Sequence, residues 1–113
     1  MEKHAWIESF PGSVTVCNRE GLLIEMNAAS IEAYKEDGGD ALLGTSAIDC
    51  HTGPSRSKLC QMMERQQANI YTTERDGQKK LVYQAPWYQE GEYAGFIELM
   101  LPLPPDMPHF IRD

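Results

Sequence analysis

Cys50 and His51 are adjacent, a thiol beside an imidazole, and they are the first residues in this chain to suggest chemistry. Adjacent side chains usually point in different directions, so we do not expect this pair to act as a nucleophile and its base. The plainer interpretation is a small core cysteine beside a histidine that hydrogen-bonds a loop or a helix start. The sequence has no HExxH, no GxSxG and no phosphate-binding glycine loop, and we therefore expect a protein that is not an enzyme.

Five further side chains are candidates for lining a ligand cavity. Leu59 and Met63 lie at helical spacing, and a methionine-rich helix face adapts to varied apolar ligands, although core packing is its default role. Arg56, early in the same segment, can pair with an acidic ligand, with solvation as the default. Tyr83 and Trp87 share one face of a predicted strand. They line a cavity if that face is concave, and they need a partner if it is convex.

Composition limits the class of protein and its partners. A chain of 113 residues with 42% apolar residues fits one globular domain with a modest core. The net charge of −7 disfavours nucleic acid and anionic membranes as partners. No apolar run approaches a membrane span or a secretory signal. The three cysteines form no CxxC pair, so we expect reduced thiols in the cytoplasm and no structural zinc site.

The elements that must position these residues follow from turn signals and periodicity. We predict an α+β fold, in which a five-stranded antiparallel sheet has short helices and one longer helix inserted between its second and third strands. Asn27 offers an N-cap for the first inserted helix, and Pro86 predicts a bulge or an edge in its strand. The expected strands are Val14–Cys17, Leu22–Met26, Ile70–Arg75, Lys79–Tyr88 and Tyr93–Leu101, and the longer helix is Ser55–Gln67.

The two ends of the chain differ from this central region. Trp6, Ile7 and Phe10 lie at helical spacing in a short segment, and they need cover from the sheet or from a second copy of the chain. We assign residues 1–12 to an N-terminal helix that contributes to dimerisation and residues 13–101 to the domain. Residues 102–113 form a proline-rich tail, which we expect to be extended.

The order of the predicted elements resembles the PAS domain, and so do local residues. Gly21 ends the first turn, Asn27-Ala28-Ala29 opens the helix after the second strand, and Leu42-Leu43-Gly44 lies in the middle. Trp87-Tyr88, an acidic glycine turn and Tyr93–Glu98 complete the pattern. The resemblance implies a sensory or interaction module, commonly dimeric, with a cavity between sheet and helices. The chain departs from the family where Leu101-Pro102-Leu103-Pro104 replaces the usual lead into a signalling helix.

Asp49-Cys50-His51 followed by Pro54-Ser55 resembles a subgroup of bacterial PAS domains that have a Cys-His-Pro-like segment. In this chain Thr52 stands at the position of that proline. Our first hypothesis is a cytoplasmic sensor with a small ligand bound by Cys50, His51, Arg56, Leu59, Met63, Tyr83 and Trp87. It signals through homodimer contacts of Trp6, Ile7 and Phe10, with a signalling effector as a further partner.

Two alternatives stay open. The first is a ligand-free dimerisation module. The second, implied by the resemblance to haem-binding PAS domains, is a haem sensor with His51 as the iron ligand. Among the cofactor alternatives, we first expect that the domain binds none. Flavin is less well supported than haem, because Asp49-Cys50-His51-Thr52 does not match the Asn-Cys-Arg-like segment of flavin photosensors. In addition, Glu98 stands where those domains have glutamine.

Overall fold

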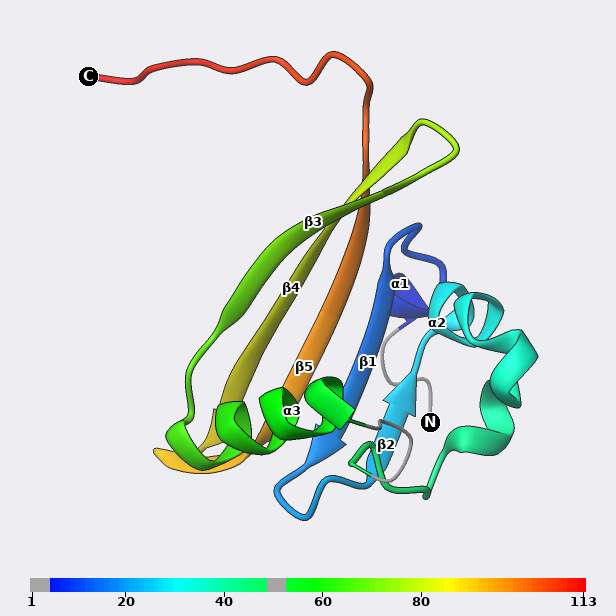
Figure 1. Cartoon of the computed structure of the whole chain (residues 1–113), viewed down its shortest axis with the longest axis vertical. Helices are drawn as coiled ribbons and strands as arrows, with labels where there is room; N and C mark the ends of the chain where they lie inside the picture. Colours follow the sequence, from blue (N-terminus) through cyan, green and yellow to red (C-terminus); the bar gives the residue numbers. More distant parts are fainter. Residues whose placement is uncertain (1–4, 49–52) are drawn as a thin grey trace.

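A computed structural model describes residues 5–48 and 53–113 of the chain (Figure 1). Within these residues one antiparallel sheet is accompanied by α-helices and two short 3-10 helices. The elements in chain order are α1 (Ala5–Glu8), β1 (Ser13–Asn18), β2 (Leu23–Met26), α2 (Ala28–Ala33), η1 (Lys35–Asp37), η2 (Gly39–Leu42), α3 (Gly53–Arg65), β3 (Asn69–Arg75), β4 (Gln78–Gln89) and β5 (Glu92–Leu103). The predicted fold class is confirmed.

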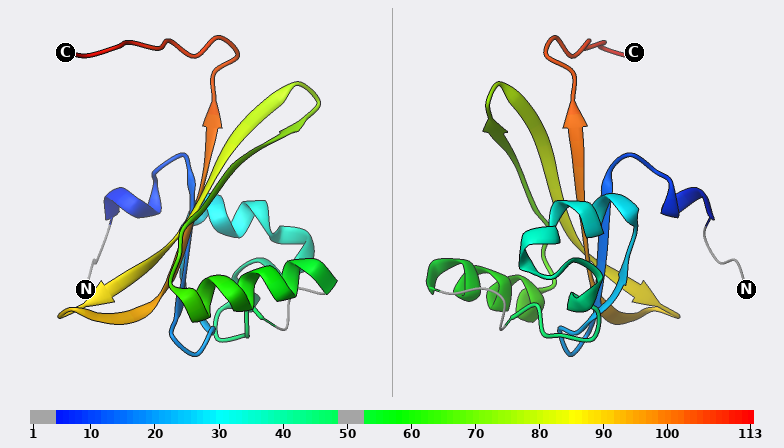
Figure 2. Two further views of the ribbon diagram at one scale, coloured as in Figure 1. Left: turned by 60° about the vertical axis from the view of Figure 1, so that its left-hand side comes forward. Right: turned by 90° about the vertical axis from the view of Figure 1, so that its right-hand side faces the viewer.

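The sheet has the strand order β2-β1-β5-β4-β3, so the last strand of the chain lies at its centre. The helical segment between β2 and β3 crosses one face of the sheet, and α1 lies on the opposite face (Figure 2). One face of the sheet is therefore covered by α2 and α3, and of the described helices only α1 lies on the other face.

Two tight turns set the pairing of the last three strands. Asp76 and Gly77 adopt φ values of 51° and 79°, and Glu90 and Gly91 adopt 52° and 82°. Two successive residues with positive φ are typical of the hairpin turn whose twist matches that of the flanking strands, and glycine adopts this conformation without steric cost. Both turns were predicted from their glycine signals.

Pro86 in β4 and Pro102 in β5 each lie where their strand has a neighbouring strand on one side only. The pairing of β3 with β4 begins at Asn69 opposite Gln84, so Pro86 has only β5 beside it, and the β4–β5 register shifts one residue later. The predicted bulge or edge at Pro86 is confirmed. Pro102 lies opposite Lys80, two residues beyond Met100, which pairs with Ser13, the first residue of β1. The strand therefore runs to Leu103, further than predicted, because a missing N–H costs nothing on an open side.

Asn27 joins four parts of the fold. Its Oδ1 accepts from the backbone N–H of Ser30 at 3.0 Å and of Val14 at 2.9 Å. Its Nδ2 donates to the carbonyl oxygens of Ile7 and Gly12, both at 2.9 Å. The side chain thus caps α2, as predicted, and also ties α1 and β1 to it, although only 1% of the residue is exposed.

The core between sheet and helices centres on Cys17, Met62 and Phe96, against which Leu59 and Met63 pack. The long helix α3 spans Gly53–Arg65, two residues earlier at each end than predicted. The helix α1 is limited to Ala5–Glu8, shorter than the predicted segment. No helix in the described part of the chain has the length and apolarity needed to cross a membrane.

Candidate functional site

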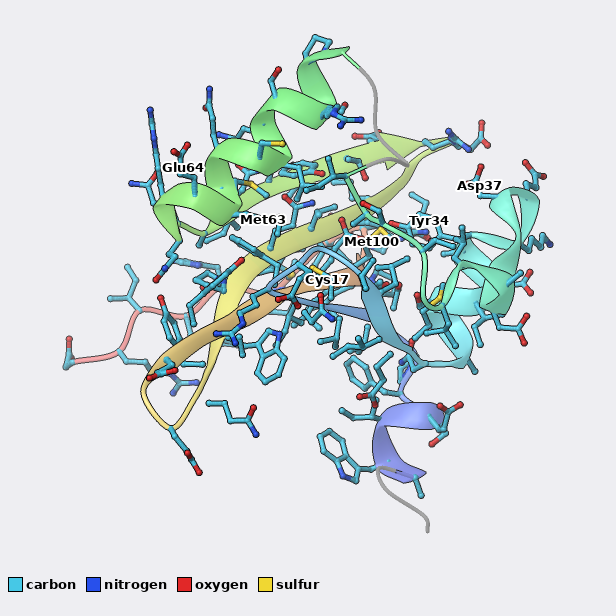
Figure 3. All side chains as sticks on the ribbon, turned by 90° about the horizontal axis from the view of Figure 1, so that it is seen from below. Cys17, Tyr34, Asp37, Met63, Glu64 and Met100 are labelled. Carbon is cyan, nitrogen blue, oxygen red and sulfur yellow. The ribbon has the colours of Figure 1, made fainter. Side chains whose placement is uncertain are left out.

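A cavity of about 400 Å³ lies between the sheet and the inserted helices. This volume is within the usual range of small-molecule sites, which is roughly 300–1,000 Å³. The sheet and the helical segment between β2 and β3 both contribute to the described lining, which consists of Thr15, Cys17, Leu23, Tyr34, Asp37, Leu42, Ala47, Leu59, Met62, Gln84, Phe96, Ile97 and Glu98. Seen from below the sheet, Tyr34 and Asp37 come from the helical segment at one side, and Cys17 lies towards the middle (Figure 3).

One row of polar side chains crosses this face of the sheet. The strand registers place Thr15 opposite Glu98, Glu98 opposite Gln84, and Gln84 opposite Asn69. Paired residues of neighbouring strands lie on the same face, so these four form a line across four strands. Apolar residues flank the line, and Phe96 is one position away along the same face.

The polar row is hydrogen-bonded around the carboxylate of Glu98. The Tyr34 hydroxyl donates to Oε1 of Glu98 at 2.7 Å, and Nε2 of Gln84 donates to Oε2 at 2.8 Å. Nδ2 of Asn69 in turn donates to Oε1 of Gln84 at 3.0 Å, which fixes the orientation of that amide. At the other end, the hydroxyls of Thr15 and Ser30 are 2.6 Å apart. Each Glu98 oxygen therefore has one neutral donor.

Electrostatics keep the surrounding hydroxyl groups protonated. Burial raises the pKa of Tyr34 well above its usual range, and the adjacent Glu98 carboxylate raises it further. The pKa of Tyr71 is raised by the same two causes in the same order. Tyr34 is thus a hydroxyl donor at every physiological pH, and the charge at this end of the cavity belongs to carboxylates.

Cys17 lines the cavity as a thiol and not as a nucleophile. Burial raises the pKa of Cys17, and nearby Glu98 also raises it, whereas a hydrogen bond with the backbone of Phe96 acts in the opposite direction. A reactive cysteine needs its thiolate form near neutral pH, and this environment disfavours that form.

Of the predicted ligand-binding residues, Leu59 lines the cavity, and Met63 lies close by between α3 and the strands (Figure 3). Arg56 is exposed on α3 and is not part of the lining. Cys50 and His51 lie outside the described residues, so their predicted role stays a prediction.

Tyr83 and Trp87 lie on the opposite face of the sheet from the cavity. Gln84 lines the cavity, and its neighbours in β4 point the other way because side chains alternate along a strand. Tyr83 is 40% exposed there. The two aromatic residues do share one strand face, as predicted, but that face points away from the cavity. Neither residue belongs to the site.

Trp87 instead holds the end of β1. It lies opposite Gly95, and its indole N–H donates to the carbonyl oxygen of Cys17 at 3.1 Å. A Cβ atom built on Gly95 would overlap that same carbonyl oxygen, and Gly95 has a φ of 146°. Glycine at this position allows β1 to approach β5 closely.

Sequence reasoning missed three residues of the site, which are Tyr34, Gln84 and Glu98 as members of one hydrogen-bonded group. A signal for Glu98 was present, because a single carboxylate within the apolar run from Ala94 to Leu101 predicts either a charged group with specific partners or a buried site. The partners themselves could not be found this way, since Tyr34 is 64 positions distant.

Solved structures of other proteins share this arrangement of sheet and helices. The PAS domain of BvgS from Bordetella pertussis matches with a TM-score of 0.61 at 19% identity, over 89% of this chain and 83% of that chain. The chain has the PAS fold. A C-terminal domain from Streptococcus mutans matches with a TM-score of 0.71 at 15% identity, over 86% of this chain and 79% of that one. No protein-family model and no curated protein sequence matches the chain.

A further solved structure is that of a Vibrio cholerae receptor, Aer2, described as a dual PAS-heme oxygen sensor. It matches with a TM-score of 0.59 at 11% identity, over 82% of this chain and 95% of that chain. These identities establish a shared fold, and a PAS fold hosts many ligands and outputs. The function of this chain must therefore be argued from its own cavity.

Proposed function

We propose that this chain is a sensory module that binds a small ligand in the cavity between sheet and helices and signals through contacts with a second copy. The cavity carries the proposal. It has a volume of about 400 Å³, apolar walls and a polar group, Glu98 with Tyr34 and Gln84, at one place. Sites for small molecules share this combination of apolar lining and a few placed polar groups.

Filling the cavity tests the proposal. Leu59→Trp enlarges a side chain that lines the cavity, whereas Cys60→Trp makes a comparable change at the next, exposed position of α3. We expect native mass spectrometry of the purified full chain to show a bound small molecule in the wild type and in Cys60→Trp, and not in Leu59→Trp. The neutral probe 2-phenylethanol should likewise shift the NMR signals of cavity residues in the first two proteins alone. The proposal is wrong if the wild type retains no ligand and the probe shifts no cavity residue.

The face opposite the cavity supports the dimer. Trp6 is 71% exposed and Phe10 is 40% exposed on this side, where Ile24 is 48% exposed as well. Phe10 reaches towards Leu101 of β5, because a Cβ on Gly12 would meet both side chains. The side chain of Phe10, which follows α1, and that of Leu101 in the sheet thus adjoin. Exposed apolar side chains gathered on one face are typical of an interface.

The dimer has its own test. Trp6→Glu introduces a charge into the patch and should convert a dimer to a monomer in sedimentation velocity. Phe110→Glu makes the same kind of change in the C-terminal tail, at a side chain that is 69% exposed, and should leave the dimer intact. An unchanged dimer in Trp6→Glu removes α1 from the proposed interface.

A ligand-free dimerisation module is the second candidate, and the exposed apolar face favours it. The two candidates differ in the cavity experiment. A dimer that loses assembly on Trp6→Glu but binds no small molecule in the wild type supports the second candidate alone.

The haem alternative depends on His51, which lies outside the described residues. In the described lining, Met62 and Cys17 contribute sulfur atoms, and no histidine is present. The two propionates of haem would find Glu98 and Asp37 there and no cationic side chain. Reconstitution with haemin gives a direct test, because a Soret shift that disappears in His51→Ala would support iron ligation by His51.

A further inference from the structure

Glu98, one of two carboxylates in the described cavity lining, has spare hydrogen-bonding capacity. An ionised carboxylate can accept about four hydrogen bonds. Glu98 accepts one at each oxygen, from Tyr34 and from Gln84. Both donors are neutral, so neither balances the negative charge. The lining leaves room for a further donor, because the same residues border the open volume of the cavity.

No cationic side chain compensates Glu98 within residues 5–48 and 53–113. The cavity lining there contains no lysine, arginine or histidine, and it contains a second carboxylate, Asp37. Elsewhere in the described part of the chain, Arg19 pairs with Glu20 and Lys35 pairs with Glu32. The cavity therefore has two carboxylates, of which Glu98 is half-buried and Asp37 is exposed at its edge. A ligand that brings a positive charge would offset the cost of holding Glu98 partly away from bulk water.

The remaining walls determine what accompanies that charge. Beyond the polar row, large apolar side chains face the cavity from both layers, and they are Leu23, Leu42, Leu59, Met62 and Phe96. These groups favour an apolar body on the ligand, with the charged end next to Glu98 and the rest against α3 and β5. An anionic ligand would meet repulsion from Glu98 and Asp37, the two carboxylates of the described lining.

The polar row is also built in advance. Asn69 orients the Gln84 amide so that its N–H donates to Glu98, and Tyr34 donates from the other side. The carboxylate is thus held by two groups from two different layers of the fold. A ligand that binds it has no side-chain ordering to impose there, and such preorganisation increases affinity.

We infer that the cavity selects a protonated amine with a compact apolar body, whose ammonium group binds Glu98 and lies near Asp37. The inference rests on the proposed ligand-binding function and specifies its ligand class. Charge complementarity with Glu98 and Asp37 identifies the amine end, and the apolar lining identifies the body.

Three probes of matched size test the inference with the full chain. They are 2-phenylethylamine, 2-phenylethanol and 3-phenylpropanoate, which differ in the charge at the polar end. We expect calorimetric titration at pH 7 to rank them amine, alcohol, carboxylate, with the amine about tenfold tighter than the alcohol, because charge-assisted hydrogen bonds are about twice as strong as neutral ones. This ranking uses the unaltered protein, so it does not depend on any variant folding.

Two charge-neutralising variants locate the preference. Glu98→Gln should bring the amine and the alcohol to within about threefold of each other. Glu64→Gln removes the same charge from an exposed position of α3 (Figure 3) and should keep the tenfold difference. NMR shifts of the cavity residues confirm that each probe binds at this site.

Three results would overturn the inference. The first is an alcohol that binds as tightly as the amine in the unaltered protein. The second is an amine preference that survives in Glu98→Gln. Both would reject the ligand class and leave the proposed ligand-binding function standing, since a probe still binds in the cavity. The third is that none of the three probes binds, which overturns the inference. If native mass spectrometry also shows no retained ligand, the proposed function is contradicted together with it.

Discussion

Removing the Asn27 side chain should be among the most damaging single changes in this fold. Asn27→Ala deletes four hydrogen bonds, two accepted from Val14 and Ser30 and two donated to Ile7 and Gly12. The side chain is almost fully buried, so several of the four partners would be left without a substitute.

The expected loss follows from this count. A hydrogen bond contributes a net of about 1 kcal/mol, and each buried group left unpaired costs more than that. Deleting the four bonds should therefore lower the free energy of unfolding by about 3–5 kcal/mol, a large share of the roughly 5–15 kcal/mol typical of a domain.

Urea denaturation followed by circular dichroism measures this loss. Asn18→Ala is the matched control, because Asn18 accepts from the backbone of Glu20 and Leu22 at 3.0 Å in an exposed turn. It should cost about 1 kcal/mol, since water replaces both bonds. Asn27→Ala should move the midpoint by roughly 2 M with an unchanged slope. If Asn27→Ala costs no more than Asn18→Ala, the reasoning about the buried hydrogen bonds is refuted.

Three further predictions follow from single contacts. Gly95→Ala should lower the free energy of unfolding by more than about 2 kcal/mol in the same assay, because its Cβ would overlap the Cys17 carbonyl oxygen, and an unchanged midpoint would contradict the close approach of β1 and β5. Tyr34→Phe should cost about 1–3 kcal/mol at pH 7, where the hydrogen bond to Glu98 is intact. Because the pKa of Tyr34 is raised in the folded state, its contribution is complete below about pH 10 and is lost as the pH rises further, so the wild type should lose more stability than Tyr34→Phe between pH 9 and 11. Iodoacetamide should modify exposed Cys60 and spare Cys17 until the chain unfolds, because burial raises the pKa of Cys17 and blocks access, and equal labelling of the two in native protein would refute this placement.

The sequence determined the elements and the turns between them. Gly77 and Gly91 mark hairpins because positive φ is unfavourable for other residues, and Asn27 marks a helix start because its side-chain oxygen can bond to free amides. These are local effects, which depend on a few neighbouring residues. The order of such elements was sufficient to predict an inserted helical segment over a five-stranded sheet.

Tertiary structure decided which face of the sheet is covered and which side chains meet on it. Alternation showed that Tyr83 and Trp87 share a face, but only the path of α2 and α3 across the sheet shows that they lie away from the cavity. The register shift after Trp87 has an equally large effect, because without it Gln84 would lie opposite Ile97 instead of Glu98. A shift of one residue reverses the face of every side chain that follows, and no local signal gives its exact position. The hydrogen-bonded group of Tyr34, Gln84 and Glu98 therefore exists only when distant segments pack together.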